Sequence, residues 1–598
     1  MKTQNERAPI VCRGAPGVRP GVRPFYANAR KQSSVNEGAR KVRPYGLLFF
    51  GALVCAVFSC GLAAGEINVI PRPAQIVRDD AKADAPLGAA HVIVCADAAL
   101  GRVYADTLLE WTGLRLAVHP TTATAAGRPV ISVDSASRST NAHIAHPEGY
   151  ALEVAADGAV RIEASARNGA FYALQTLAQL VARDGARVTL PVVRIYDSPR
   201  FKWRGVLFDD GRHFFGPVAA KRLIDAMALY KFNTLHWHLT EDQGWRIEIK
   251  KYPKLTQIGA WRANSPTPGD RNKPDGVPHG GYYTQDEVRE IVAYAHQRGI
   301  TVVPEIEIPG HAAAAIASYP ELGNSDIEGY APKVVETWGV KPYVFAPKDE
   351  TFRFLQDVLD EVCELFPNSK YIHIGGDEAP KKQWKASAFA QKVIRENNLK
   401  DEFELQSWFL ARIEKYLNAR GRRIVGWDEI QEGGLSPTAT MMVWRDWKWA
   451  RLAIEKGNDV VMTPNSHCYV DYLSSADDKP TDPYYEQPPL NRSGNRPQRL
   501  VTLEKAYHFE PIPEGTLPER EKQVLGCQAN LWGEYLFDWN RAEYSLYPRM
   551  FALAEVAWSP KEARDWNCFQ KRLPSAIRYL DKVNANYRRP DGSPARAR

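Results

Sequence analysis

Two adjacent carboxylates, Asp377 and Glu378, stand in the segment KYIHIGGDEAP, residues 370–380. Its apolar residues alternate and predict a short buried strand, which ends at the two glycines before the acids. A strand followed directly by two acids in the next loop is typical of α/β enzymes whose acid chemistry takes place at the carboxyl edge of the sheet. The pair alone is also typical of a solvated turn or the first turn of a helix. The choice between these interpretations depends on the surrounding chain.

Eight apolar, strand-like runs alternate with helical segments beyond Pro199, and this rhythm is typical of a (β/α)8 TIM barrel with insertions. The expected strands are 203–208, 234–239, 300–308, 371–374, 423–427, 440–444, 459–462 and 524–529. Helices are expected at 217–232, 284–299, 350–366, 404–421 and 545–558. The loop 465–523 carries too much Pro and Asn to form a regular element. We therefore predict an α/β fold with a catalytic barrel over residues 201–570, followed by a C-terminal helix and tail at 571–598.

Polar and aromatic residues follow nearly every expected barrel strand. They are Asp209, Asp210, Arg212, His213, Glu241, Asp242, Glu305, Glu307, His311, Asp377, Glu378, Trp427, Asp428, Glu429, Trp444, Arg445, Asp446, Asn465, His467, Tyr469, Asp471, Trp532 and Glu534. Because the carboxyl ends of barrel strands share one face, these side chains are expected to converge there. Aromatic walls around a ring of carboxylates suit a sugar, whose C–H faces stack on indole while its hydroxyls need charged partners.

Residues 66–200 predict a small α/β domain that supports the barrel. Strands are expected at 67–70, 91–96, 114–120, 129–133 and 150–164, the last with a hairpin turn at Asp157-Gly158, and helices at 100–111 and 167–181. This part of the sequence contains no convergent set of acids or histidines, so no site is expected in it.

The composition of residues 1–65 predicts a basic leader followed by a secretory signal. Residues 1–45 carry a net charge of +8 while the whole chain carries +7, so the rest of the chain is close to neutral. The basic balance therefore gives no support to nucleic-acid binding. The uncharged run 46–65 ends in small residues and predicts export with cleavage near Ala64. Cys60 lies in a sequence that loosely resembles a bacterial lipobox, so both soluble export to the periplasm or medium and an outer-membrane lipoprotein remain open, as does an uncleaved anchor.

The cysteines indicate neither a disulfide framework nor a zinc site. Cleavage near Ala64 leaves five of them, at positions 95, 363, 468, 527 and 568, and none forms a Cys-x-x-Cys pair. No metal and no cofactor is expected.

The chain resembles glycoside hydrolase family 20, the β-N-acetylhexosaminidases, over nearly the whole mature length. The segments that carry the resemblance are IPRPAQIV, RGVLFDDGRHF, LHWHLTEDQGWRIEI, VVPEIEIPGH, IHIGGDE, VGWDEI, VWR, CYVDY and NLWGEY, which occur in the family's order. The resemblance implies release of terminal β-linked N-acetylhexosamine by a retaining, substrate-assisted mechanism, an exception to the scheme with two catalytic carboxylates.

Roles for individual residues follow from the same resemblance. Glu378 would be the general acid, Asp377 would orient the acetamido N–H of the substrate, and Tyr469 would hydrogen-bond the acetamido oxygen, which acts as nucleophile. The Asp377 carboxylate is expected to help keep Glu378 protonated. The resemblance also implies that Arg204 and Glu534 bind sugar hydroxyls as a charged clamp, with Asp471 assisting. Trp427, Trp444 and Trp532 would form a box around the acetamido group and the ring. Asp242 and His311 would support the catalytic acids.

Three other interpretations remain open. A retaining glycosidase with two carboxylates could pair Glu378 with Glu429 or Glu534 at a separation of about 5 Å. A metal-dependent barrel hydrolase could recruit the set His311, His373, His467 and Asp377. A sugar-binding protein without activity would keep the tryptophans but would have no reason to keep Asp377 beside Glu378.

Overall fold

The computed structural model describes residues 67–120, 127–267, 270–475 and 499–589. The leader lies outside these residues, and with it the expected signal sequence and Cys60. In the described part of the chain, no helix combines the length and the apolar character needed to cross a bilayer.

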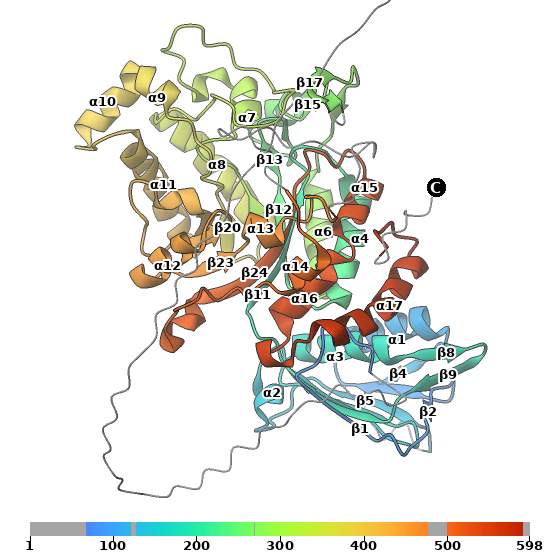
Figure 1. Cartoon of the computed structure of the whole chain (residues 1–598). Helices are drawn as coiled ribbons and strands as arrows, with labels where there is room; N and C mark the ends of the chain where they lie inside the picture. Colours follow the sequence, from blue (N-terminus) through green and yellow to red (C-terminus); the bar gives the residue numbers. More distant parts are fainter. Residues whose placement is uncertain (1–66, 121–126, 268–269, 476–498, 590–598) are drawn as a thin grey trace, which may run out of the picture. The chain divides into compact units, whose positions relative to one another are not determined.

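Eight strands close a parallel barrel in chain order (Figure 1). They are β11 (Trp203–Asp209), β12 (Thr234–His238), β19 (Thr301–Glu305), β20 (Tyr371–His373), β21 (Arg423–Trp427), β22 (Thr440–Val443), β23 (Val460–Met462) and β24 (Val524–Leu531). Pairing of β11 with β24 completes the ring. Nearly all of their residues are buried, as expected for parallel strands with helices outside and packed side chains inside. The predicted barrel is confirmed.

Amphipathic helices cover the outside of the barrel. The main ones are α4 (Gly216–Leu229), α6 (Gln285–Gln297), α8 (Asp349–Leu365), α11 (Glu402–Asn418), α12 (Trp447–Lys456) and α16 (Arg549–Trp558). Helix α6 shows why such segments are helical. A capping box between Thr284 and Glu287 satisfies backbone N–H groups at its start, and Val288, Ile291 and Ala295 form a buried stripe at helical spacing.

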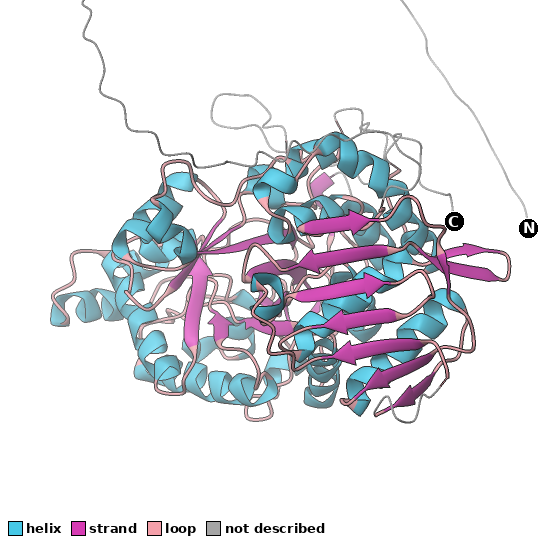
Figure 2. Cartoon of the chain, turned by 90° about the horizontal axis from the view of Figure 1, so that it is seen from below, coloured by secondary structure: helices cyan, strands magenta, loops and turns pink. Residues whose placement is uncertain are grey.

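The N-terminal domain is built on a mixed seven-stranded sheet, whose strands lie side by side in Figure 2. In spatial order they are β1 (Gln75–Arg78), β10 (Val193–Asp197), β6 (Tyr150–Val154), β7 (Val160–Glu163), β5 (Val130–Asp134), β3 (Val92–Cys95) and β4 (Ala117–His119). Helices α1 (Ala98–Thr112) and α3 (Arg167–Leu180) pack on this sheet. The expected hairpin turn at Asp157-Gly158 joins β6 to β7, and Gly158 has φ 87°, a conformation that favours glycine.

Some local expectations were wrong. Residues 67–70 are not a strand, although Val69 and Ile70 are buried, and the backbone N–H and C=O of Ile70 pair with the Gln179 side chain instead of with a strand. The described parts of the loop 465–523 contain short helices, namely α13 (Asn465–Cys468), α14 (Leu503–Tyr507) and the 3-10 helix Pro518–Gln523. The expected boundary after residue 570 falls inside helix α17 (Trp566–Lys582).

Buried ion pairs join the N-terminal domain to the amino ends of the barrel strands. Arg204, the second residue of β11, makes two hydrogen bonds to the Glu148 carboxylate, at 2.7 and 3.0 Å. Lys231, just before β12, binds Asp197 of β10 at 2.9 Å, and both side chains are fully buried. The role expected for Arg204 on sugar hydroxyls is therefore wrong. Its side chain lies at the opposite end of the barrel from the strand termini where a site would form.

We expect Glu148→Ala to lower the free energy of unfolding by about 3 kcal/mol, because it leaves the buried Arg204 guanidinium without its partner. The KM for a sugar substrate should stay unchanged. Denaturant unfolding and steady-state kinetics measure the two quantities. Glu153→Ala is the matched control, because the Arg194–Glu153 pair of the same domain is largely exposed and should contribute less than about 1 kcal/mol. If Glu148→Ala instead raised KM without lowering stability, this would indicate that Arg204 contacts the substrate.

Candidate active site

Residues 375–379 follow β20 and carry the two acids Asp377 and Glu378. We call this segment the acid turn. Gly375 and Gly376 have φ of 63° and 92°, and Glu378 itself has φ 45°. A Cβ on Gly375 would lie 1.8 Å from Glu307 Oε2, so both the conformation and the space require glycine there. The turn leaves the Asp377 side chain mostly buried and the Glu378 side chain 37% exposed. Glu378 is thus the acid that reaches toward solvent.

His311 links the acid turn to a second pair of acids. Its Nδ1 lies 2.7 Å from Glu241 and 3.3 Å from Asp242, while its Nε2 lies 3.7 Å from Asp377 and 3.6 Å from Glu378. Burial disfavours the charged form of His311, but the Glu241 and Asp377 carboxylates outweigh burial and raise its pKa well above the ordinary value. We therefore describe His311 as an imidazolium held between two pairs of carboxyl groups. Its own φ of 47° shows that the backbone is shaped to place it there.

Arg212 and Glu241 extend this charge network to the carboxyl end of β11, the first strand of the barrel. The Arg212 guanidinium lies 3.0 Å from Glu241 and 3.2 Å from Asp209. It also lies over the Trp532 ring, 4.9 Å from the centroid. Arg212 follows the carboxyl end of β11, whereas Arg204 lies near the amino end of the same strand. At the rise per residue of a strand, Arg204 is roughly 16 Å from the carboxyl end of β11. Arg212, and not Arg204, therefore lies at the face where the acids and tryptophans converge.

The aromatic side chains expected around a sugar do lie together. Ring centroids of Trp427 and Trp532 are 5.5 Å apart, and those of Tyr469 and Trp532 are 6.1 Å apart. Trp444 stacks on Tyr469 at 6.3 Å and 15°. The four rings come from the carboxyl ends of different strands and the loops after them, so the fold assembles a box from residues far apart in sequence.

Buried acids anchor two of the indoles. The Trp427 Nε1–H donates to Glu305 at 2.8 Å, and the Trp444 Nε1–H donates to Glu429 at 3.0 Å. Burial, with the nearby charges of Asp377 and Asp428, raises the pKa of Glu429 to about 9. Glu429 is therefore protonated at neutral pH and is unsuited to be the nucleophile of a glycosidase with two catalytic carboxylates.

Asp471 and Glu534 add two acids beside the box. Burial and the charge of Glu534 raise the pKa of Asp471 to about 8, and burial also raises the pKa of Glu534 against the pull of Arg212. Asp377 Oδ1 and Asp471 Oδ1 are buried, and neither has a hydrogen-bond partner among the residues that the structure describes. Such atoms cost free energy unless a ligand or water satisfies them, so they mark where polar groups of a substrate would bind.

The proton balance of the acid pair differs from the sequence-based expectation. Burial and the charges of Glu378, Glu305 and Glu241 raise the pKa of Asp377 to about 7. Burial also opposes ionisation of Glu378, but the adjacent His311 and the Arg212 charge outweigh it and lower its pKa. Below about pH 7 the structure therefore favours a protonated Asp377 beside an ionised Glu378, whereas the sequence predicted that Asp377 would help keep Glu378 protonated.

Histidines and acids also form three buried groups that could hold a metal ion. In the described residues these are His236, Glu305 and His373; His238, Glu305 and Glu307; and Glu241, Asp242 and His311. The residues proposed for a metal hydrolase do not come together in one of them. His373 belongs to the Glu305 group, while His467 packs against Trp447 and Phe509.

The structure thus brings ten of the eleven predicted site residues to one face of the barrel and leaves out Arg204. They are Asp377, Glu378, Tyr469, Asp242, His311, Trp427, Trp444, Asp471, Trp532 and Glu534. Arg212 and Glu241 were expected at this face because both follow strand ends in the sequence, but no individual role was assigned to either of them. Strand direction was the signal that could have found Arg212, because only residues at carboxyl ends reach this face.

Comparison with known proteins matches both domains. Residues 201–561 match the family model of the glycosyl hydrolase family 20 catalytic domain, and residues 66–198 match domain 2 of that family. A Beta-hexosaminidase of Porphyromonas gingivalis is 40% identical over 568 residues, which cover 91% of this chain and 68% of that protein.

Two solved structures share the architecture. The GH20 exo β-N-acetylglucosaminidase of Vibrio harveyi, in complex with N-acetylglucosamine, has a TM-score of 0.75 and 32% identity, covering 88% of this chain and 78% of that chain. A mutant Streptomyces plicatus β-hexosaminidase in complex with its product GlcNAc has a TM-score of 0.71 and 30% identity, covering 88% and 97%.

We expect catalysis to require one shared proton on the Asp377–Glu378 pair. As pH rises through about 7, the pKa of Asp377, the free enzyme loses this proton, and kcat/KM should fall. In Asp377→Asn the neighbouring negative charge is gone, so the proton depends on the lowered pKa of Glu378 alone. The alkaline limb of the residual activity should then move to lower pH. An unchanged limb in pH–rate profiles would contradict the shared proton.

Proposed function

The chain belongs to glycosyl hydrolase family 20 and is a β-N-acetylhexosaminidase, and we propose that its active site removes terminal, non-reducing β-linked N-acetylglucosamine and N-acetylgalactosamine from oligosaccharides or glycoconjugates. Chitooligosaccharides, which end in such a residue, fit this description. The single observation that carries the proposal is the acid turn, with Asp377 and Glu378 at His311, next to the box of Trp427 and Trp444.

Glu378 acts as the general acid. It is the more exposed of the two acids, so it can reach the glycosidic oxygen, which lies between the sugar and the leaving group. Its proton passes to that oxygen as the bond to C1 breaks. Glu378 then removes a proton from the water that attacks C1 and so returns to its starting state.

Asp377 acts on the acetamido group of the substrate. The acetamido oxygen attacks C1 and forms an oxazolinium ion, and the Asp377 carboxylate accepts a hydrogen bond from the acetamido N–H as positive charge develops there. This step needs Asp377 ionised and Glu378 protonated. Binding of the N–H to the unpartnered Asp377 Oδ1 favours the ionised form, and so moves the shared proton to Glu378.

The remaining side chains recognise the sugar. Tyr469 donates to the acetamido oxygen, and its high pKa, caused first by burial, keeps the phenol protonated. Arg212, Glu534 and Asp471 bind hydroxyls of the ring. Trp427, Trp444 and Trp532 enclose the acetamido methyl and one face of the sugar, while His311 supports the acids and Asp242 supports His311.

The other interpretations are less consistent with the site. Glu429 carries a proton at neutral pH and is bound to Trp444, so it is a poor nucleophile. A sugar-binding protein without activity gives no role to the acid turn, in which Glu378 keeps an unfavourable backbone conformation.

We expect the purified protein to release the aryl group from aryl β-N-acetylglucosaminides and to leave aryl β-glucosides intact. The glucoside lacks the acetamido nucleophile, so no oxazolinium can form from it. The two substrates are compared at equal concentration by release of the phenol. Comparable rates on both would contradict substrate assistance.

Variants of the acid pair serve as the control in the same assay. Glu378→Gln should lose on the order of 10²- to 10⁴-fold on poor leaving groups and less on activated ones, which hardly need protonation. Asp377→Asn should be slowed by a similar factor on both. The same leaving-group dependence in the two variants would overturn the division of roles.

We further propose that the protein is exported and acts in the periplasm or outside the cell, either soluble or tethered as an outer-membrane lipoprotein through Cys60. The basis is the basic segment followed by the apolar run 46–65.

Fractionation of cells that express the full chain tests the proposal. We expect a processed protein outside the cytoplasm. Cys60→Ser should move it from the membrane to the soluble fraction if the anchor is a lipid, and should change nothing if the protein is soluble. Full-length protein with an intact N-terminus in the cytosol would contradict export.

A further inference from the structure

At Glu378 the acid turn adopts a backbone conformation that the residue itself does not favour. Three of its residues have positive φ, and Glu378 is not a glycine. A side chain in this region persists only where the surrounding structure determines it strongly. The groups that hold the turn therefore decide where the Glu378 carboxyl points.

Three carbonyl oxygens of the turn are held from outside. Gly375 O accepts from the Trp427 backbone N–H at 2.8 Å. Gly376 O accepts from the Gln406 Nε2 amide at 2.8 Å, and Ala379 O accepts from the Lys381 Nζ at 2.8 Å. The last two contacts flank Asp377 and Glu378 on either side.

Gln406 and Lys381 are bound to each other as well as to the turn. Lys381 Nζ donates to Gln406 Oε1. An ammonium group can only donate, so this bond fixes the amide with its oxygen toward Lys381 and its N–H toward Gly376. Gln406 is 1% exposed and lies in the second turn of α11, so its side chain is held in place by the packing around it. Lys381 lies near the Phe403 ring, 5.0 Å from the centroid, and is surrounded by acids including Glu429 and Glu432.

We propose that Gln406 and Lys381 are positioning residues for the reaction. Their joined side chains clamp the carbonyls before and after the acid pair and so aim the Glu378 carboxyl at the glycosidic oxygen. Neither side chain takes part in proton transfer. The inference rests on the proposed role of Glu378 as general acid.

Loss of the clamp should therefore reproduce part of the loss of the acid itself. A shift of the turn moves Glu378 relative to the leaving oxygen, and a displacement of about 1 Å can cost about 10²-fold in rate. Substrates whose leaving group needs a proton suffer from this, whereas strongly activated aryl leaving groups do not. A general loss of folded enzyme would instead slow every substrate by the same factor.

The experiment compares Gln406→Met, Gln406→Glu and Lys381→Met on a poor and an activated leaving group, both as β-N-acetylglucosaminides. We expect kcat to fall about 10- to 100-fold on the poor leaving group and less than about 3-fold on the activated one, with KM little changed. Lys381→Arg, which keeps donors for both contacts, should restore much of the lost rate. Gln406→Glu keeps the bond to Lys381 but removes the donor to Gly376, so it isolates the bond to the turn.

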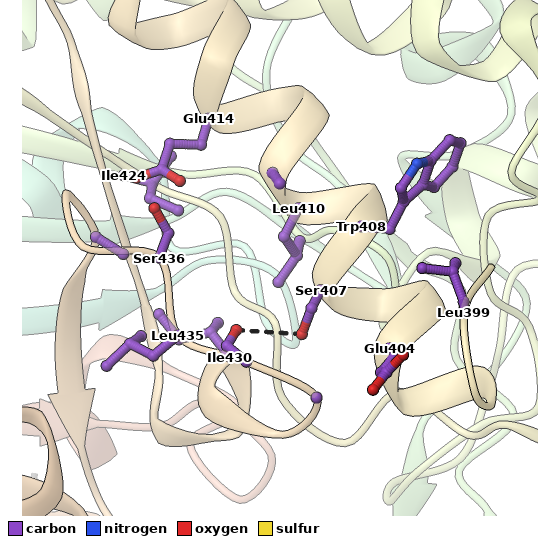
Figure 3. Close-up of a pocket in the computed structure, with 14 residues that line it drawn as sticks. Leu399, Glu404, Ser407, Trp408, Leu410, Glu414, Ile424, Ile430, Leu435 and Ser436 are labelled. Carbon is purple, nitrogen blue, oxygen red and sulfur yellow. Dashed lines mark hydrogen bonds between the residues drawn. The ribbon is translucent and has the colours of Figure 1, made fainter. Parts of the chain in front are cut away.

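Ser407→Ala is the matched control. Ser407 is the next residue of α11, and its hydroxyl donates to the backbone oxygens of Glu432 and Gly434. Figure 3 shows it beside Leu410, on the face of α11 that lines a separate cavity of about 390 Å³. This variant also removes a bond from the helix to a carbonyl, but not one in the acid turn, so its ratio of the two rates should match that of the wild type.

Each outcome decides the question. A rate ratio that changes in the Gln406 and Lys381 variants, but not in Ser407→Ala, supports the clamp. Equal losses on both leaving groups, or no loss in any variant, overturn it. A wild-type enzyme that does not cleave β-N-acetylglucosaminides would instead refute the proposed function, and Glu378→Gln without leaving-group dependence would refute the role on which the clamp depends.

Discussion

The buried imidazolium of His311 is the interaction on which the active site depends. It lies within 4 Å of four carboxyl groups, two from the segment Glu241-Asp242 and two from the acid turn. Without a cation there, like charges would repel across a space that water does not screen. His311 therefore makes the close approach of these acids possible. His311 lowers the pKa of both Asp377 and Glu378, and the pKa of Asp377 is nevertheless raised because burial and the neighbouring carboxylates outweigh this effect.

The aromatic box depends on charge in a similar way. Trp427 and Trp444 are each fixed by a hydrogen bond from the indole N–H to a buried acid, and Trp532 lies under the Arg212 guanidinium. These partners satisfy the polar edge of the two anchored indoles. The faces of the rings are then free to contact the apolar side of a sugar, which is where indole recognition is strongest. The carboxyl groups of the site thus serve two purposes, because some react with the substrate and others hold the walls.

The N-terminal domain supports this arrangement from the other end of the barrel. Its ion pairs to the barrel, Glu148 with Arg204 and Asp197 with Lys231, are at the amino ends of β11 and β12. Removing one partner of such a pair leaves an uncompensated buried charge, so each pair fixes how its partners are placed across the contact between the two domains. Stability is concentrated at one end of the strands and chemistry at the other, which is the usual division in this fold.

Much of the fold and of the site could be predicted from the sequence, because the signals are local. Eight buried strands follow from runs of apolar residues, and the acid pair and the tryptophans follow from what stands at the end of each run. The resemblance assigned the sugar contact to Arg204, which lies inside β11 at its amino end, rather than to Arg212, which follows its carboxyl end, and the run 67–70 looked like a strand although it is not one. The tertiary structure alone decided that the Arg212 guanidinium contacts Glu241 and Trp532, that the pKa of Asp377 is raised while that of Glu378 is lowered, and that Gln406 reaches the acid turn. The physical reason is that periodicity and turn chemistry act between neighbours in the chain, whereas charge coupling and side-chain contacts act through space between residues that only the closed barrel brings together.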